Sequence, residues 1–165
     1  MAEVELLALR DDLPLGGPVL WLREVGGRRV LAITIGAREA ESIGWALEGI
    51  EFPRPMTHDL LATVVSDLGA TLSEVRITHV DAGTFFADVV LAREGETLRI
   101  SARPSDAIAL AVRVGAPLAA DESVLAEAGI EIEETEDEGQ GVDEGEVVEQ
   151  FREFLDAVQP EDFAP

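Results

Sequence analysis

Short runs rich in valine and leucine open the chain and predict three β-strands. The first two runs cover residues 3–10 and 18–25, and the third covers residues 30–35. Gly26 and Gly27 separate the second run from the third, and a two-residue spacing of this kind favours a tight hairpin turn. The first part of the chain is therefore expected to hold three strands, two of them joined as a hairpin.

The period of the apolar residues then changes from that of a strand to that of a helix. Ala40, Ile43 and Leu47 recur at helical spacing, with Glu39 in the first turn, where the helix dipole favours an acid. A second apolar stripe predicts a helix over residues 57–68; it is formed by Leu60, Leu61, Val64, Val65 and Leu68. The prolines between the two helices predict an extended connector.

Alternation returns after the second helix and predicts an antiparallel meander. Its strands include residues 75–78, 85–91 and 98–100, with turns at residues 81–83 and at Gly95. Residues 104–114 are apolar nearly all round, which predicts a helix buried inside the domain or against a second subunit. A short helix over residues 123–128 and a last strand over residues 130–132 are expected to follow.

These elements predict one α+β domain over residues 1–130, with a largely antiparallel sheet and helices packed on it. Residues 131–145 are acids and glycines with almost nothing to bury, which predicts a flexible linker. Residues 146–160 carry an apolar stripe and predict a C-terminal amphipathic helix that Pro160 ends. Because an isolated helix this short is marginal in water, it is expected to dock on the chain's own core or on a protein partner.

Charge separates the domain from the tail. The net charge is −22, of which residues 1–130 carry −9 (20 acids, 11 arginines) and residues 131–165 carry −13 (14 acids, one arginine). A protein this acidic is repelled by phosphate backbones unless its arginines gather in one cleft. An acidic tail could cover such a cleft as a mimic of nucleic acid. This would reconcile the negative net charge with binding of nucleic acid in the cleft.

The composition excludes several chemistries. The chain has no cysteine, which removes thiolate catalysis, cysteine-ligated metal sites and disulfides. No apolar run approaches the roughly 18 residues that a membrane span needs, and acids stand where a signal peptide needs basic residues. The sequence therefore predicts a cytoplasmic protein that does not contact a membrane.

Two polar clusters stand at predicted helix starts. One covers residues 54–59 and the other residues 103–106, and each combines an arginine, a proline, a hydroxyl and an aspartate. A helix start offers free N–H groups that can receive a phosphate beside an arginine. The alternative is capping, with Thr57 and Ser105 as N-caps and the arginines as partners of the acids. Arg113 shares a stripe with Asp106, so that acid lies between two arginines.

The two histidines have different surroundings. His58 follows a helix start next to Asp59 and could act as a general acid, a general base or a metal ligand. His79 shares a strand face with Val75 and Ile77, which predicts a packed structural histidine. No glycine-rich phosphate loop, Ser-His-Asp order or His-Glu-x-x-His pattern is present.

Four stretches of the chain, residues 33–40, 54–61, 83–87 and 103–113, resemble in order the bifunctional nuclease domain family. The resemblance implies a compact α+β domain with a largely antiparallel sheet, a homodimer or higher homo-oligomer, and cleavage of both DNA and RNA, an activity ascribed to some members. The family's characteristic polar positions fall on Glu39, Arg54, Thr57, His58, Asp59, Arg103, Ser105, Asp106 and Arg113.

If the resemblance extends to activity, it implies metal-assisted hydrolysis of nucleic acid. In this hypothesis Asp59 and Asp106 hold one Mg²⁺ or Mn²⁺, which prefer oxygen ligands. His58 activates water or protonates the leaving oxygen, and Arg54 and Arg103 offset phosphate charge. No organic cofactor is expected. The mechanism requires the two helix starts to converge in the folded chain.

The competing hypothesis is a non-enzymatic oligomeric binding or regulatory module that uses the same polar cleft. Overall acidity favours it, because a nucleic-acid substrate is repelled by negative charge. The absence of lysine and of tyrosine, with aromatic residues at only 5%, also favours it, since single strands are commonly bound on aromatic side chains.

Overall fold

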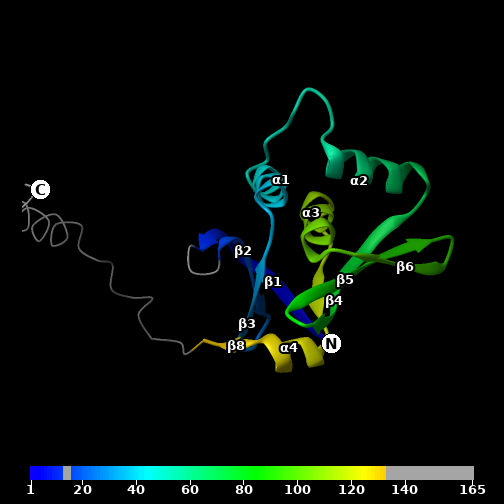
Figure 1. The fold of residues 1–165 in the computed structure, drawn as a ribbon. Coiled ribbons are helices and arrows are strands. Elements are labelled where there is room, and N and C mark those ends of the chain that lie inside the picture. Colours follow the sequence, from blue (N-terminus) through cyan, green and yellow to red (C-terminus); the bar gives the residue numbers. More distant parts are fainter. Residues whose placement is uncertain (13–15, 133–165) are drawn as a thin grey trace, which may run out of the picture. The chain divides into compact units, whose positions relative to one another are not determined.

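The computed structural model describes residues 1–12 and 16–132, which fold as an α+β domain (Figure 1). The strands are β1 (Ala2–Asp12), β2 (Gly17–Glu24), β3 (Arg29–Thr34), β4 (Thr71–Asp81), β5 (Thr84–Arg93), β6 (Glu96–Ala102), β7 (Leu118–Ala120) and β8 (Ile130–Glu131). The helices are α1 (Ala37–Leu47), α2 (Thr57–Asp67), α3 (Pro104–Val114) and α4 (Glu122–Ala128). None of these helices is long and apolar enough to cross a membrane.

One mostly antiparallel sheet contains the eight strands in the order β6-β5-β4-β7-β1-β2-β3-β8. The predicted hairpin at Gly26 joins β2 to β3, and the predicted meander is β4-β5-β6. The short strand β7 connects the two groups, because Leu118 pairs with Val4 of β1 on one side and with Val75 of β4, in parallel, on the other. The predicted fold class is confirmed.

Helix α3 lies in the core of this domain, as its apolar sequence predicted. The five residues from Ala107 to Ala111 are buried, and they pack in the same cluster as Ile43 of α1 and the inner faces of the strands. In Figure 1, α1 and α3 lie side by side, and α4 lies apart from them at the lower end of the strands. A helix that is apolar all round requires this central position, since every face must be covered.

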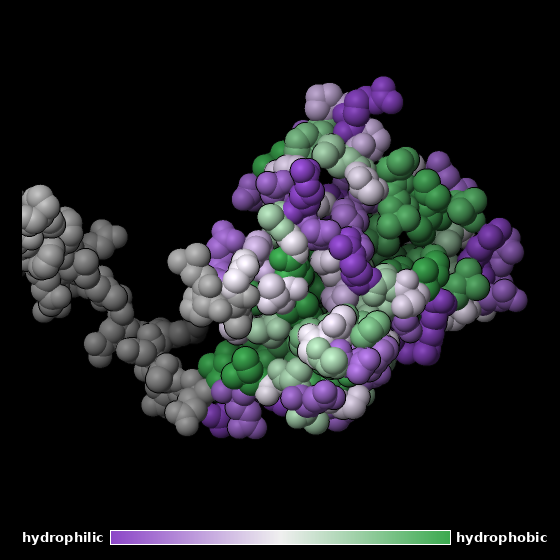
Figure 2. Space-filling view, viewed as in Figure 1, coloured by the Kyte–Doolittle hydropathy of each residue, from purple (hydrophilic) through white to green (hydrophobic). Residues whose placement is uncertain are grey.

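Helix α2 differs from the other helices, because none of its residues is fully buried. Most of its predicted apolar stripe is exposed, including Leu60, Leu61, Val64 and Leu68. The neighbouring edge strand β6 also exposes Leu98 and Ile100. Figure 2 shows the resulting apolar patch over α2 and beside β6.

The described residues and the predicted divisions of the chain overlap only in part. The compact unit covers Met1–Ile132. The predicted linker over residues 131–145 lies outside the described residues except for its first two positions, and the predicted C-terminal helix over residues 146–160 lies wholly outside them.

Candidate active site

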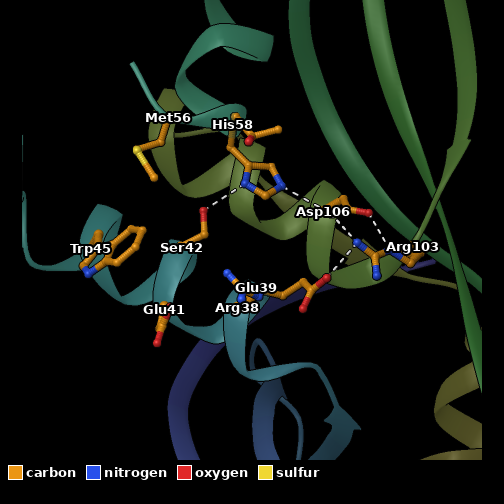
Figure 3. Close-up of a pocket in the computed structure, with 10 residues that line it drawn as sticks. Arg38, Glu39, Glu41, Ser42, Trp45, Met56, His58, Arg103 and Asp106 are labelled. Carbon is orange, nitrogen blue, oxygen red and sulfur yellow. Dashed lines mark hydrogen bonds and ion pairs between the residues drawn. The ribbon is translucent and has the colours of Figure 1, made fainter. Parts of the chain in front are cut away.

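The first turn of α2 places His58 between side chains from two other helices (Figure 3). Its Nδ1 lies 2.8 Å from the hydroxyl oxygen of Ser42 in α1. Its Nε2 lies 3.2 Å from Oδ1 of Asp106 in the first turn of α3. The two predicted helix starts therefore converge, and a serine, a histidine and an aspartate form one hydrogen-bonded chain that no sequence motif revealed.

Hydrogen bonding fixes the protons in this chain. Asp106 is ionised near neutral pH and only accepts, so Nε2 of His58 must carry a proton and donate it. In the neutral imidazole Nδ1 then accepts, and the Ser42 hydroxyl donates to it. Arg113 can only donate, and its Nη2 lies 3.2 Å from the Ser42 hydroxyl oxygen. Ser42 thus links Arg113 to His58 and selects one tautomer of the ring.

Asp106 is also held by Arg103, the residue that precedes α3. Nε and Nη2 of Arg103 donate to the two carboxylate oxygens over 2.7 Å and 3.0 Å. Burial opposes ionisation of Asp106, but the hydrogen bonds from Arg103 and His58 outweigh it and hold its pKa below the usual value. Nη2 of Arg103 lies 2.9 Å from Glu39 as well. Hydrogen bonds from Asp106 and Glu39 in turn raise the pKa of Arg103.

Asp59 and Arg113 form a second ion pair, which lies behind the imidazole. Arg113 donates through Nε to Asp59, and its other nitrogens reach the backbone carbonyls of Ala109 and Ser42 over 2.8 Å and 3.1 Å. The hydrogen bond from Arg113 lowers the pKa of Asp59 despite partial burial, and the Met56 N–H, 2.8 Å from its other oxygen, adds to this. This pair connects the end of α3 to the start of α2.

A pocket of about 310 Å³, here called the His58 pocket, opens over the first hydrogen-bonded chain. It is lined by Arg38, Glu39, Glu41, Ser42, Trp45, Met56, Thr57, His58, Arg103 and Asp106. Glu39 and Asp106 share Arg103, whereas Arg38 is exposed and has no ion pair or hydrogen bond within residues 1–12 and 16–132. Arg38 is thus a cation available to an incoming anion.

The structure brings five of the predicted site residues to this pocket and leaves four outside its lining. Those that line it are Glu39, Thr57, His58, Arg103 and Asp106. Those outside are Arg54, which is exposed on the connector before α2, Asp59, Ser105 and Arg113. The N-caps of α2 and α3 are Met56 and Arg103, so the capping interpretation of Thr57 and Ser105 is wrong by one residue and two residues respectively.

Sequence reasoning missed Arg38 and Ser42. Both lie in α1, and Ser42 follows Glu39 by three positions, so helical spacing places those two side chains on one face. A serine at a helical position gave no separate signal, because only the fold brings α2 and α3 beside it.

His79 is not the packed histidine that its strand position predicted. A bulge in β4 between Ile77 and His79 shifts the pairing with β5 by one residue. A shift of one residue turns a side chain to the opposite face of a sheet. His79 is exposed and stacks on Phe86, with ring centroids 4.3 Å apart.

The surroundings of Asp59 and Asp106 do not fit the predicted divalent cation. Each carboxylate already binds an arginine, whose positive charge would face the ion. Within the described part of the chain, no three histidine, aspartate or glutamate side chains are grouped so that they could hold a metal. Binding of Mg²⁺ or Mn²⁺ stays a prediction.

Comparison with known proteins identifies the family of this chain. The model of the bifunctional nuclease domain matches residues 20–133, which include the three helices that build the site. The chain belongs to the bifunctional nuclease domain family. Relatives within it differ in how much of the chain they share.

Two groups of relatives illustrate this range. An uncharacterized protein of Mycobacterium tuberculosis is 45% identical over 164 residues, which are 99% of this chain and 98% of that protein. Bifunctional nuclease 1 of Oryza sativa subsp. indica and bifunctional nuclease of Oryza minuta are each 27% identical over 130 residues. Those residues are 77% of this chain and 39% of each rice protein.

Proposed function

We propose that this member of the bifunctional nuclease domain family hydrolyses phosphodiester bonds in DNA and RNA, with His58 as the general acid. One observation carries the proposal: His58 lines a pocket while Ser42 and Asp106 fix its orientation and tautomer. An imidazole positioned by a carboxylate is a common proton-transfer group in hydrolases. The match to the nuclease family and the names of the rice relatives support the substrate class.

The protons that His58 carries suit the breaking of a P–O bond. In its acid form His58 carries a proton on both ring nitrogens, and Nδ1 donates to the hydroxyl oxygen of Ser42. Water attacks phosphorus, the bond to the leaving oxygen breaks, and His58 donates its Nε2 proton to that oxygen, which leaves a neutral ring with its proton on Nδ1. Ionised Asp106 stabilises the imidazolium before transfer. The Nε2 contact to Asp106 is the longer of the two ring contacts, at 3.2 Å against 2.8 Å, so a substrate oxygen in the pocket can compete for this proton. The proton of the attacking water leaves to solvent.

Arginines supply the charge that the reaction requires. The phosphoryl oxygens gain negative charge as water attacks, and guanidinium groups stabilise that charge. Arg38 has no carboxylate partner in the described residues and Arg103 lies between Glu39 and Asp106, so both can turn donors toward a phosphate at the pocket. Arg54, on the connector before α2, stays a predicted contact to the strand outside the pocket.

Cleavage of labelled oligonucleotides tests the proposal. The purified chain is incubated with single- and double-stranded DNA and RNA, in EDTA and with added Mg²⁺ or Mn²⁺. His58→Ala and Asp106→Asn are expected to lower the cleavage rate by roughly 10²- to 10⁴-fold, the usual contribution of a positioned proton-transfer group. His79→Asn, at an exposed histidine outside the lining of the His58 pocket, is the matched control and is expected to cleave normally.

Cleavage that survives both substitutions would contradict the proposal. Activity restored only by a metal ion, with both variants inactive, would support the metal hypothesis in addition. Because a contaminating nuclease would not follow the substitutions, the comparison of variants decides the assignment.

The exposed apolar patch favours one further possibility, a non-enzymatic oligomeric module. Leu60, Leu61 and Leu68 of α2 are exposed and β6 is an edge strand of the sheet, two features that a second copy of the chain could cover. Light scattering of the wild type and of a Leu61→Glu variant tests this. A wild-type monomer would argue against an oligomeric module, and an oligomer that also fails to cleave any substrate would favour it.

A further inference from the structure

A second pocket adjoins the His58 pocket and shares only Arg103 with it. It encloses about 370 Å³ and is called here the Ser105 pocket. Three separate segments form it: the end of β3 with Thr34 and Gly36, the β4–β5 turn with Thr84, and the start of α3 with Ser105. Three of the four stretches that carry the family resemblance thus meet here.

The two pockets differ in charge. The charged residues that line the His58 pocket are three acids and two arginines, Glu39, Glu41, Asp106, Arg38 and Arg103, whereas the only charged residue that lines the Ser105 pocket is Arg103. Nε and Nη2 of Arg103 bind carboxylates, while its Nη1 has no partner within the described residues. An anion is therefore better received in the Ser105 pocket.

The hydroxyl of Ser105 is left without a hydrogen-bond partner by the described residues. Ser105 is 6% exposed, and nothing in residues 1–12 and 16–132 makes a hydrogen bond with its side chain. Its oxygen is not among the fully buried unpartnered atoms of the described residues, so the hydroxyl reaches the space of the pocket. Because this side chain lines the pocket, a ligand acceptor there would satisfy it.

The backbone at the same place adds a donor. Ser105 is the second residue of α3, after Pro104, and N–H groups in the first turn of a helix have no acceptor within the helix. They carry the positive end of the helix dipole. Together with Nη1 of Arg103 and the Ser105 hydroxyl, the Ser105 N–H forms a set of donors suited to the several oxygens of a phosphate.

We propose that the Ser105 pocket binds a phosphate group of the substrate strand, next to the phosphodiester that is cleaved in the His58 pocket. This inference rests on the proposed function for its substrate, but the binding site itself does not depend on cleavage. A nucleic acid strand carries one phosphate per nucleotide, so one strand can occupy both sides of Arg103. The apolar wall of the pocket, which includes Phe85 and Ile35, suits the sugar or base attached to that phosphate.

Amide NMR titrations of the full chain test the site directly. The probes are inorganic phosphate and a thymidine dinucleotide with and without a terminal phosphate. Phosphate is expected to shift the amide signals of Ser105 and Asp106, and the terminal phosphate is expected to tighten binding of the dinucleotide. Because a hydrogen bond to a charged group is lost, Ser105→Ala is expected to weaken phosphate binding about tenfold.

A charge placed in the pocket provides a second variant. Thr84→Asp adds a carboxylate at an exposed position that lines only the Ser105 pocket, and it is expected to abolish the shifts at Ser105. Thr97→Asp, on exposed β6 outside both linings, is the matched control and is expected to bind phosphate normally. Wild-type amide dispersion confirms folding of each variant, and Thr34→Asp replaces Thr84→Asp if that variant is unfolded.

The outcomes separate this inference from the proposed function. Unchanged phosphate binding in both Ser105→Ala and Thr84→Asp would overturn the phosphate site, whatever the chain cleaves. A terminal phosphate that adds nothing to dinucleotide binding would overturn the placement of the strand and leave a site for free phosphate. His58→Ala is expected to stop cleavage and keep phosphate binding. A wild type that binds phosphate as described but cleaves nothing would overturn the proposed function alone.

Discussion

Arg113 and Asp59 are 54 positions apart in the sequence, yet they form an ion pair that holds the end of α3 against the start of α2. The side chain of Arg113 is 9% exposed and that of Asp59 is 36% exposed. Since the same guanidinium also reaches Ser42, the orientation of His58 depends on a pair that does not line the pocket.

Replacement of Arg113 is expected to lower stability and activity together. Arg113→Met leaves Asp59 without its partner, and we expect the free energy of unfolding to fall by about 1–3 kcal/mol, less than for a fully buried pair because water reaches the carboxylate. Urea denaturation measures the change. Arg23→Met, which removes an exposed partner of Glu5, is the control and is expected to change stability little. Equal losses in the two variants would contradict a special role for Arg113.

The same carboxylates predict how stability depends on acid. The pKa values of Asp59 and Asp106 lie below 3.8 in the folded chain, so the unfolded state binds more protons than the native state around that pH. Their contribution to stability is complete above the unfolded pKa and is lost as the pH falls through the folded values. The urea concentration at the midpoint of unfolding is measured between pH 7 and pH 2.5. It should decrease once the pH drops below about 4. Asp59→Asn should flatten this fall, whereas Asp67→Asn, at an exposed position of the same helix, should not.

Ser42 is expected to act on the reaction through His58. Ser42→Ala removes the hydrogen bond at Nδ1, so the ring is held at Nε2 alone and its orientation is less fixed, and the cleavage rate should fall about five- to tenfold. A purely structural serine would lower stability without changing the pH dependence of kcat. A changed pH profile, with a restored profile in Ser42→Thr, would support the positioning role. An unchanged profile in the alanine variant would contradict it.

Arg38 is expected to contribute to substrate binding and not to stability. It lines the pocket and makes no ion pair in the described residues, so Arg38→Gln should raise KM and leave the urea midpoint unchanged. If the guanidinium contacts a phosphate, the dependence of binding on salt should weaken by about one counterion. Arg99→Gln, on exposed β6, is the matched control. A KM equal to that of the control would exclude this contact.

The acidic tail is expected to oppose binding of nucleic acid. Residues 133–165 contain 13 acids and one arginine, so their removal changes the net charge from −22 to −10. A chain that ends at Ile132 should bind single-stranded RNA more tightly than the full chain at low salt, and the difference should shrink as salt is added. Fluorescence anisotropy measures both. Unchanged or weaker binding would reject the hypothesis that the tail covers an arginine cleft.

The sequence predicted the elements that have a clear period, and it failed where only tertiary structure decides. The strands on both sides of Gly26 and the buried helix at residues 104–114 carry strong patterns, and the structure confirms them. The strand Leu118–Ala120 has three residues, too few to show a period, so no alternation revealed it. The bulge in β4 reversed the predicted face of His79 for a similar reason, because one inserted residue leaves no signature in composition.

The candidate site was also predicted in part, and the prediction again failed where only tertiary structure decides. The residue types at the two helix starts identified His58, Arg103 and Asp106, which meet in one pocket. They did not distinguish the acid that lines the pocket from the acid outside its lining: Asp59 and Asp106 both follow a helix start closely, and only the packing of α3 against α1 and α2 brings Asp106 to His58 and Asp59 to Arg113. Ser42 was missed because its role depends on a neighbour 16 positions away.

The placement of β7 has a consequence for the order in which the protein matures. Within residues 1–12 and 16–132, the two groups of strands join only through residues 118–120, which leave the ribosome after all three helices of the site. The edge of β1 therefore stays unpaired until more than a hundred residues have been synthesised. The loop between β1 and its partner strand is long, and long loops are slow to close. The sheet is completed late, by a strand that contributes no residue to the His58 pocket.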